Sequence, residues 1–374
     1  MINHRHSVVA SFTLGIVAAA ALTTVVATPA VAQSICTVCP PPPPPPAPPP
    51  AADPTVHGRI TGAGIEAATR FLRRLDDRGW ATVAGRERGG GGADATPAAS
   101  VVQGFRAWTE AYGVETRLSD QGAIPGERRR ANGFIAGIGA FLGPDAAIGI
   151  AVDSGVSHVD VAGIPQHGRL AMTQIGINAA YQYALWSISV SAIYGAGDVG
   201  VQRGDGIDVS SADYGARVWG GIGEIAYNGW SIDDWRIVPK LGADWTLSHS
   251  DGFTETGGAD PVTGTAQESE RARAWLGLEV GRSFSSAVAV VDLSVYGRVV
   301  DVFYAHDQLA EVTSAAAPTA RLVQVANEGS WGVDWGAAAS VQVAPMMRFY
   351  AVYDGRYREH ADSHGGTLGV ELRW

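Results

Sequence analysis

A strict alternation of apolar and polar side chains runs through residues 365–374. One face of the predicted β-strand carries four apolar side chains, Leu368, Val370, Leu372 and Trp374. Because side chains alternate across a strand, this face meets an apolar environment while the other meets polar groups. The pattern is typical of a strand that serves membrane insertion, closes a barrel and places an aromatic ring at the membrane interface. An edge strand of a soluble β-sandwich is the alternative.

The same alternation recurs from Phe105 onward and predicts about twelve strands. The clearest begin at Trp186, Trp235, Arg271, Val288 and Trp331. Short connections are expected near 143–145, 184–185, 228–233, 285–286 and 344–345, and long polar ones near 119–130, 159–168, 200–210, 250–266 and 305–328. This order matches the periplasmic turns and extracellular loops of outer-membrane barrels. We therefore expect an all-β membrane fold, an antiparallel transmembrane β-barrel of about twelve strands over residues 105–374.

The polar faces of these strands carry glycine and charged residues, which predicts a wet lumen with room for a further element. The residues expected to face this lumen are Asp244, Glu279, Asp292, Arg298, Asp334 and Arg348. Two positions break the pattern. Pro239 sits within a strand, where it removes a ladder hydrogen bond. Glu224 shares strand parity with the apolar Val218 and Ile222, and a β-bulge before it would turn it inward.

A helical repeat precedes the strands, within Ile60 to Trp80. Its apolar positions are Ile65, Ala68, Leu72 and Leu75, and the charged residues Arg70, Arg73, Arg74 and Asp77 lie mostly on the other side. From Gly64 to Gly79 the helix would measure about 24 Å, close to the ~25 Å apolar band of a membrane barrel. We expect it to thread the lumen with its charged side chains meeting lumen residues. Packing elsewhere in the periplasm is the alternative.

The N-terminal segment 1–32 is predicted to be a signal peptide. Basic residues precede an apolar run, and Ala30-Val31-Ala32 forms a small-residue cleavage pattern near Ala32. An uncleaved anchor helix is the alternative. Residues 33–59 form a Pro-rich extension, in which 40–50 predicts a polyproline II spacer. Cys36 and Cys39 would form a disulfide or stay free in an oxidising compartment, and residues 60–104 comprise the helix and a Gly-rich linker.

Composition narrows the class of protein. The net charge of -10 and the lack of a basic run argue against nucleic-acid binding. No stretch after the N-terminal segment is apolar for the ~20 residues that a membrane helix needs. A membrane protein without such helices must close its strands into a barrel, because lipid satisfies no backbone hydrogen bonds. The 11 tryptophans suit interfacial girdles.

Three stretches carry a family resemblance. Residues 219–227 read WGGIGEIAY, residues 238–243 read VPKLGA and run into 250–258, and residues 353–357 read YDGRY before the closing strand. In this order they resemble the translocator domain of autotransporters, the type V secretion proteins, over about Phe105 to Trp374. The resemblance accounts for Pro239. It implies a twelve-stranded barrel with an N-terminal helix in its pore, in the outer membrane of a Gram-negative bacterium. The barrel would help carry a passenger to the cell surface. Its partners would be outer-membrane lipid, the barrel assembly machinery and periplasmic chaperones.

Two departures from the family stand out. Between Gln33 and Phe105 there is no room for the usual long β-helical passenger. Residues 51–104 contain no Asn, so the self-cleavage after Asn that some members perform is not carried over.

We expect a monomeric barrel that translocates or anchors a short N-terminal segment at the cell surface. The alternative is a porin-like or adhesin-like barrel scaffold with a periplasmic arm. An enzyme is a further possibility, because His with a carboxylate can act as a general base at three predicted strand tips, His158 with Asp160, His249 with Asp251, and His306 with Asp307. These scattered pairs match no nucleophile elbow or metal motif, and we assign no catalytic, cofactor or metal residue.

Overall fold

The computed structural model describes residues 54–83, 104–286, 289–316, 318–323 and 325–374. The predicted signal peptide, both cysteines, the polyproline spacer and most of the Gly-rich linker lie outside the described residues.

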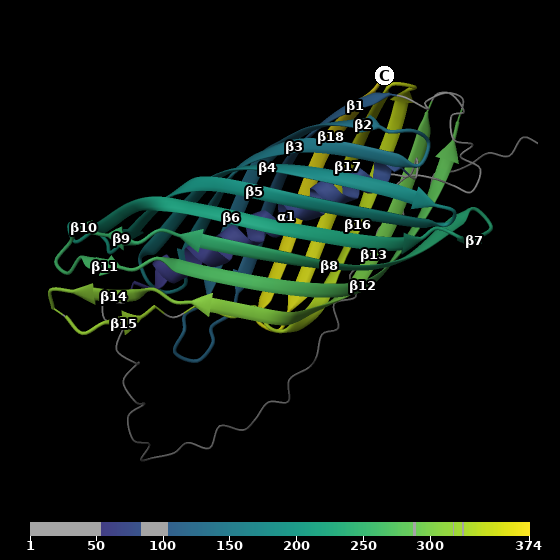
Figure 1. The fold of residues 1–374 in the computed structure, drawn as a ribbon. Helices are drawn as coiled ribbons and strands as arrows, with labels where there is room; N and C mark the ends of the chain where they lie inside the picture. Colours follow the sequence, from purple (N-terminus) through teal and green to yellow (C-terminus); the bar gives the residue numbers. More distant parts are fainter. Residues whose placement is uncertain (1–53, 84–103, 287–288, 317, 324) are drawn as a thin grey trace, which may run out of the picture. The chain divides into compact units, whose positions relative to one another are not determined.

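Twelve long strands pair in one antiparallel sheet that closes on itself (Figure 1). They are β1 (Phe105–Leu118), β2 (Glu127–Phe141), β3 (Ala146–Val161), β4 (Gln166–Tyr183), β5 (Trp186–Arg203), β6 (Ser210–Tyr227), β8 (Trp235–Ser250), β12 (Gln267–Ser285), β13 (Val290–Gln308), β16 (Trp331–Ala344), β17 (Met347–Arg358) and β18 (Ala361–Arg373). Each pairs with its neighbours in chain order, and β1 pairs with β18 to close the ring. The predicted fold class is confirmed.

The alternation predicted from the sequence sorts side chains between the two faces of the barrel wall. On β5, Ile188 and Val190 point outward, with 43% and 53% of their surface exposed, whereas Ser187 and Ser189 are buried inside. Outward apolar side chains are favourable because lipid surrounds a membrane barrel. Inward polar side chains meet one another or the helix.

The β-bulge expected before Glu224 is absent, and that expectation was wrong. The register between β5 and β6 runs without a break, and Val218, Ile222 and Glu224 all point inward. The error came from assigning apolar residues of β6 to the lipid face. They point inward because the helix packs against this part of the wall.

The long connections lie at one end of the barrel, which we call the loop end, and the short ones β2–β3, β4–β5 and β16–β17 lie at the other, the turn end (Figure 1). One connection is shorter than predicted. Strands β3 and β4 continue through most of 159–168 and leave only residues 162–165 between them. Much of the polar sequence at the loop end therefore extends the strands.

Two long connections build a second, four-stranded sheet at the loop end, which we call the mouth sheet. Its strands are β9 (Phe253–Thr254), β11 (Val262–Gly264), β14 (Glu311–Ser314) and β15 (Arg321–Leu322). Two further short strands extend the barrel, β10 (Thr256–Gly257) beside β6 and β7 (Trp230–Ile232) beside β8.

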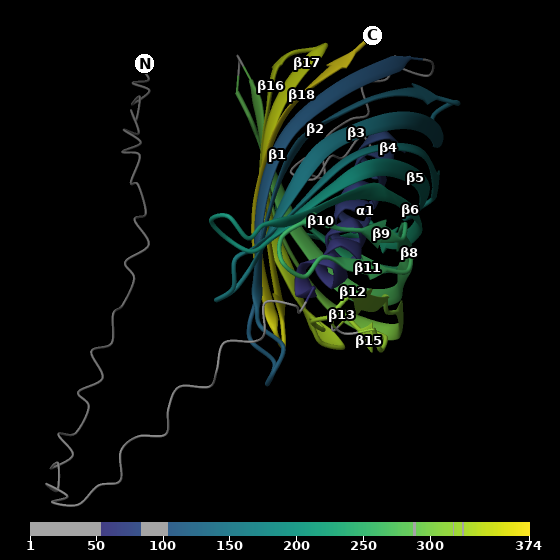
Figure 2. The same cartoon turned by 90° about the vertical axis from the view of Figure 1, so that its left-hand side faces the viewer.

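The helix α1 (Thr55–Val83) has 29 residues and lies inside the barrel (Figure 2). At ~1.5 Å per residue it measures about 43 Å, and it extends past the predicted Ile60–Trp80 at both ends. Its long apolar side chains are no more than 3% exposed at the described positions Val56, Ile60, Ile65, Phe71, Leu72 and Leu75. In the part of the chain that the structure describes, no helix is both long and apolar enough to span a membrane.

Candidate functional site

The candidate site is the lumen filled by α1, and one half of it is apolar. The apolar stripe of the helix packs against inward-facing side chains of β3 to β6, including Val159, Leu170, Ile193 and Val218. Sequence reasoning missed this half, because it expected a polar lumen throughout. Inward and outward apolar residues have the same period of two along a strand, so alternation alone does not separate them.

Glycines in the wall make room for the helix. A Cβ added at Gly176 would lie 2.5 Å from Leu75 Cδ2 and 3.1 Å from Phe71 Cε1. A Cβ at Gly168 would lie 2.8 Å from Ile60 Cδ1. These positions act as sockets for the apolar face of α1, because any larger residue would push the helix away. The sequence pattern placed glycine on a water-filled lumen surface. Gly168 and Gly176 instead contact apolar side chains of α1.

The other half of the lumen is charged. Arg73 lies 2.7 Å from Asp334, and Arg74 lies 2.6 Å from Asp354 and donates a 2.6 Å hydrogen bond to Thr367. The other two helix residues expected here, Arg70 and Asp77, line the same cavity as this cluster, and Arg70 donates to the Tyr112 hydroxyl (3.4 Å). The charged side of the helix thus faces the charged side of the barrel.

The residues expected to face the lumen all point inward. Five are buried, Asp244, Glu279, Asp292, Asp334 and Arg348, and the side chain of Arg298 is 10% exposed.

Two of these residues connect the wall to the helix. Asp334 contacts Arg73 directly, and Asp244 holds Arg273, which donates to Thr69 of α1 at 2.9 Å. Other predicted lumen residues have contacts within the wall. Glu279, for example, pairs with Arg236 at 2.9 Å and with Lys240 at 3.1 Å.

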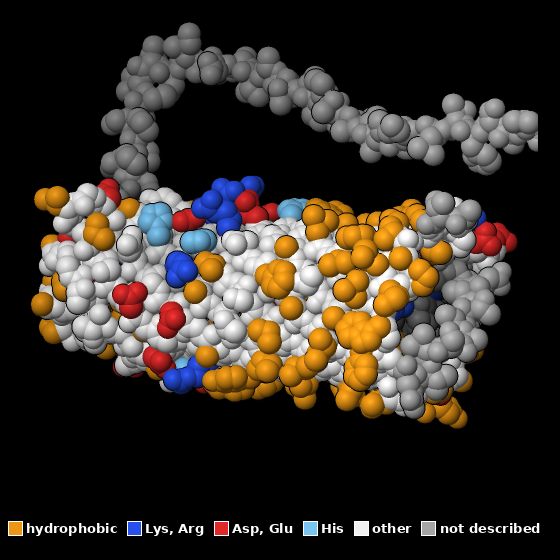
Figure 3. Space-filling view, turned by 90° about the horizontal axis from the view of Figure 1, so that it is seen from above, with side chains coloured by type: hydrophobic (Ala, Val, Ile, Leu, Met, Phe, Trp, Pro, Cys, Tyr) orange, Lys and Arg blue, Asp and Glu red, His pale blue; other side chains and the backbone are white. Residues whose placement is uncertain are grey.

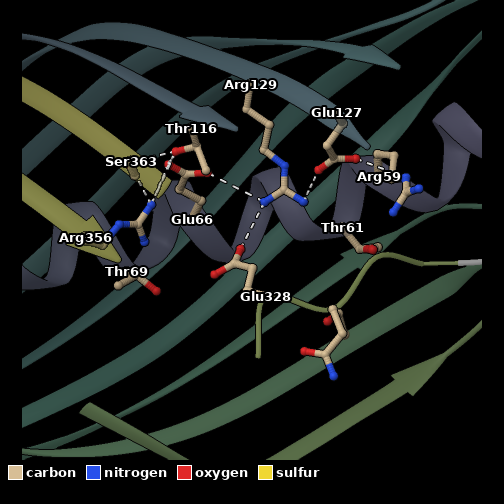
Figure 4. A network of polar contacts seen from close by, with 12 residues as sticks. Arg59, Thr61, Glu66, Thr69, Thr116, Glu127, Arg129, Glu328, Arg356 and Ser363 are labelled. Atoms are coloured by element: carbon tan, nitrogen blue, oxygen red, sulfur yellow. Dashed lines mark hydrogen bonds and ion pairs between the residues drawn. The ribbon is translucent and has the colours of Figure 1, made fainter. Parts of the chain in front are cut away.

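Glu66 is the centre of a network that sequence reasoning missed (Figure 4). Its carboxylate lies 2.8 Å from Arg356 and 3.6 Å from Arg129, and it accepts a 2.6 Å hydrogen bond from Thr116. Arg129 also lies 3.2 Å from Glu328, in the segment between β15 and β16. Burial alone would raise the pKa of Glu328, but Arg271 and Arg129 outweigh it and hold that pKa well below its usual range.

The helix C-terminal part is held at the turn end. Arg78 lies 2.9 Å from Glu110 on β1 and 3.8 Å from Glu371 on β18. Arg106, near the start of β1, donates to the backbone carbonyl of Arg78. The two strands that close the barrel therefore also bind the end of the helix. Strand parity could have found Glu110 and Glu371, since both alternate with outward residues.

The helix N-terminus is held at the loop end by a group of buried side chains that we call the latch, made of His57, Arg203, Tyr214, Phe253 and Glu255. His57 Nε2 lies 3.0 Å from Glu255 Oε1, and His57 Nδ1 lies 3.1 Å from the Tyr214 hydroxyl. The imidazole stacks on Phe253 at 3.6 Å between ring centroids. Because Phe253 belongs to the mouth sheet, the latch joins α1 to the long connections.

The latch carboxylate is strongly stabilised in its ionised form. Burial would raise the pKa of Glu255, but hydrogen bonds from His57, Arg203 and the Val262 amide outweigh it and hold the pKa at about 2. Arg203 donates to Glu255 at 2.6 Å. No local sequence signal links these residues, because 198 positions separate His57 from Glu255.

Little space is left in the lumen. A cavity of about 70 Å³ lies between the charged face of α1 and strands β13, β16, β17, β18 and β1. Since a water molecule needs about 10–15 Å³ on this measure, the cavity has room for about five. The cavity beside the charged face of α1 is therefore small.

The closing strand points its apolar residues outward. Leu368, Leu372 and Trp374 are 68%, 42% and 58% exposed, and Val370 is half-buried.

Of the His–carboxylate pairs, His249 lies 3.5 Å from Asp251, while Asp160 pairs with His167 at 2.8 Å instead of with His158. Within the described residues, no group of three or more His, Cys, Asp or Glu side chains is placed to hold a metal ion.

A family model described as the autotransporter beta-domain matches residues 107–354. The chain belongs to this family. Members of this family form translocator barrels in the Gram-negative outer membrane. The fold is a transport scaffold and does not define an enzyme family. The family resemblance seen in the sequence is confirmed.

Solved structures agree with the family. The translocator domain of autotransporter NalP from Neisseria meningitidis is similar with a TM-score of 0.67 at 15% identity, over 86% of this chain and 100% of that one. The beta domain of the Bordetella autotransporter BrkA is similar with a TM-score of 0.53 at 15% identity, over 72% of this chain and 99% of that one. A search of the curated proteins finds no match.

Proposed function

We propose that this outer-membrane barrel translocates a short N-terminal segment and anchors it at the cell surface, with α1 as the part of that segment left in the pore. The observation that carries the proposal is the direction of the helix. Its first residues contact the loop end, where the Val56 amide donates to Gln166 Oε1 at 2.9 Å. Its last turns contact the turn end through Arg78.

This direction has a topological consequence. The long connections of outer-membrane barrels face the medium, and the short turns face the periplasm. The chain before Thr55 therefore continues from the extracellular end of the lumen, while residues 84–103 link the periplasmic end of α1 to β1. In this arrangement the N-terminal segment has crossed the membrane inside the barrel, and the latch keeps it there.

The alternative functions fit less well. A periplasmic arm requires the chain before α1 to leave at the turn end, opposite to the observed direction. A diffusion pore requires an open lumen, whereas the helix leaves only about 70 Å³ beside its charged face. Adhesion through the long connections is compatible with anchoring, but Phe253 in one of these connections is buried against His57 of α1. The proposal includes cleavage near Ala32, insertion with the barrel assembly machinery and periplasmic chaperones, a monomeric state and no catalysis.

Surface labelling tests the proposal. A variant without Cys36 and Cys39 carries one epitope tag near Ala52, and an antibody is applied to intact cells, with a periplasmic protein as the control for leakage. We expect the tag to be labelled on intact cells. A tag that is labelled only after the outer membrane is opened would contradict the proposal and favour the barrel with a periplasmic arm.

A further inference from the structure

The outer wall of the barrel carries a two-row patch of charged and imidazole side chains, which we call the rim patch. It crosses β18, β1, β2, β3 and β4 near the loop end. The row nearer the loops consists of Asp362, Arg117, Arg128, Asp160 and His167, neighbours in register across the five strands. The next row consists of His364, Glu115, Arg130, His158 and Arg169.

The rim patch lies at the edge of the apolar band. Two positions deeper along the same strands the outward residues are uncharged, at Gly366, Gly113, Asn132, Val156 and Ala171. Apolar side chains such as Leu368 and Phe134 follow, 68% and 50% exposed. Figure 3 shows a cluster of basic, acidic and His side chains that borders a surface rich in hydrophobic side chains. The patch thus lies where lipid headgroups meet the wall.

The arginines of the rim patch have hydrogen-bond donors to spare. Glu115 is shared by Arg117, at 2.7 Å, and by Arg128. Asp160 is shared by Arg130, at 2.6 Å, and by His167. Since each guanidinium carries five N–H donors, one shared carboxylate leaves several of them for another acceptor.

Arg169 has no ion pair within the part of the chain that the structure describes, and its side chain is exposed. The side chains of Arg117, Arg128 and Arg130 are 62%, 47% and 53% exposed, so their remaining donors are open to a ligand.

Charge on the outer wall is distributed unevenly around the barrel. The rim patch has four arginines and three histidines against three carboxylates. At the loop end of β5, β6, β8 and β12, the wall carries one arginine, Arg217, and one histidine, His249, against five carboxylates, Asp198, Asp213, Asp251, Glu268 and Glu270. In a chain of net charge -10, this concentration of arginine on one arc sets that arc apart. An anionic ligand would be attracted to this arc and repelled by the other.

We propose that the rim patch binds the phosphate-bearing headgroup of an outer-leaflet lipid. Guanidinium groups match phosphate in shape and charge, and they bind it through paired, charge-assisted hydrogen bonds. Basic clusters beside a membrane span are an established form of anionic-lipid recognition. A lipid fits better than free phosphate, because its acyl chains would lie on the apolar wall directly below the patch. The inference depends on the barrel fold and membrane insertion, and it is independent of export of the N-terminal segment.

The test is a binding titration of the purified full-length mature protein in detergent, read by native mass spectrometry. The probe is lipid A with two phosphates, and the comparison ligands are lipid A without phosphates and inorganic phosphate. The test variant combines Arg130→Gln with Arg169→Gln. The control combines Arg217→Gln with Arg282→Gln, which removes two partly exposed arginines of the outer wall from outside the patch. Heat-modifiable migration on a gel confirms that each variant is folded.

We expect the test variant to bind diphosphorylated lipid A about tenfold more weakly, and the control to bind it like the native protein. We also expect dephosphorylated lipid A to bind weakly to all three proteins, and inorganic phosphate not to displace the lipid. Equal binding by the test variant and native protein would overturn the proposal, as would equal loss in the control. Displacement by inorganic phosphate would mean that the rim patch binds a free anion instead of a lipid. Equal binding of dephosphorylated and diphosphorylated lipid A would mean that only the apolar wall holds the lipid. Either result would overturn the proposal.

Discussion

The imidazole of His57 lies flat on the ring of Phe253, with 3.6 Å between ring centroids and 2° between the ring planes. One ring belongs to the first turn of α1 and the other to the mouth sheet. Because His57 Nε2 also hydrogen-bonds to Glu255, a single side chain fixes the helix N-terminus to a long connection by ring packing and by a hydrogen bond. The latch therefore resists movement of the helix at the loop end.

Replacing His57 with Ala should loosen the latch without unfolding the barrel. The change removes the ring stack and the His57 hydrogen bonds to Glu255 and to the Tyr214 hydroxyl, while Glu255 keeps Arg203 and the Val262 amide as partners, a local loss of about 2–3 kcal/mol. We expect more frequent channel openings in planar bilayers for His57→Ala than for the native protein. His306→Ala, at an exposed position near the loop end of β13, is the control. Identical, closed recordings for both variants would rule out a role for the latch in closure.

The latch should also weaken in acid. The pKa of Glu255 is lowered from 4.5 to about 2 in the folded protein, so its contribution to stability is complete above pH 4.5 and is lost as the pH falls towards 2. The native protein should show more channel openings across this pH range, whereas His57→Ala should respond less. An equal response of both proteins would place the acid sensitivity elsewhere.

Glu66→Gln should destabilise the filled barrel. The substitution removes the carboxylate that Arg356 and Arg129 share, and Arg356 loses its 2.8 Å ion pair. Loss of one partner from a buried ion pair costs about 3–5 kcal/mol, although Arg129 keeps Glu127 and Glu328 as partners here. The temperature at which the folded gel band disappears should fall.

The control for this prediction is Glu359→Gln, whose side chain is 57% exposed. This variant should unfold at the native temperature. A Glu66→Gln protein as stable as the control would mean that the network shown in Figure 4 contributes little to the fold.

Gly176→Leu should displace the helix while leaving the barrel closed. A side chain at this position overlaps Leu75 and Ile193, whose atoms would lie 2.5 Å and 2.8 Å from the new Cβ. Overpacking of this kind costs about 1–3 kcal/mol, and here α1 can relieve it by leaving the lumen. We expect faster proteolysis of α1 in the purified protein. Gly113→Leu on the outer wall, where a Cβ meets nothing within 4 Å, should be cut at the native rate, and equal rates for both variants would contradict the packing described.

Deleting Trp374 should lower insertion into the outer membrane. The backbones of Trp374 and Phe105 exchange two hydrogen bonds, of 2.8 Å and 3.0 Å, and their rings lie 6.4 Å apart, so this pair completes the seam between β18 and β1. The fraction of protein recovered in the outer membrane should fall, while Trp374→Phe should retain most of it because an aromatic ring and both bonds remain. Normal insertion of the deletion variant would count against a closing role for the last strand.

The sequence predicted the barrel well because its main signal is local. Where serine alternates with apolar residues, as at the start of β5, the period of two together with polarity distinguishes the inner face from the outer face. The charged face of α1 was predicted for the same reason, since Arg70, Arg73 and Arg74 follow the helical period. The beginning of the helix was placed too late, because Gly58, Gly62 and Gly64 lower helix propensity and only packing in the lumen compensates.

The rest of the site depends on contacts between distant parts of the chain. Val218 and Ile222 point inward only because a helix more than a hundred positions away packs on them, and no pattern within β6 shows this. The latch pairs His57 with a carboxylate in a connection whose own sequence predicts only a polar loop. Local patterns thus define the elements, and the fold decides which buried side chains meet.

The central claim is that α1 fills the lumen with its N-terminus at the loop end, and cysteine pairs test it most directly. In a background of Cys36→Ser and Cys39→Ser, one variant combines Val56→Cys with Gly168→Cys, since a Cβ at Gly168 would lie 3.2 Å from Val56 Cγ2. A second variant combines Val56→Cys with Gly176→Cys, the socket of Leu75, about 28 Å further along the helix. We predict that mild oxidation cross-links the first pair and not the second, seen as a gel shift that reductant reverses. No cross-link in the first pair, or equal cross-linking in both, would contradict the claim.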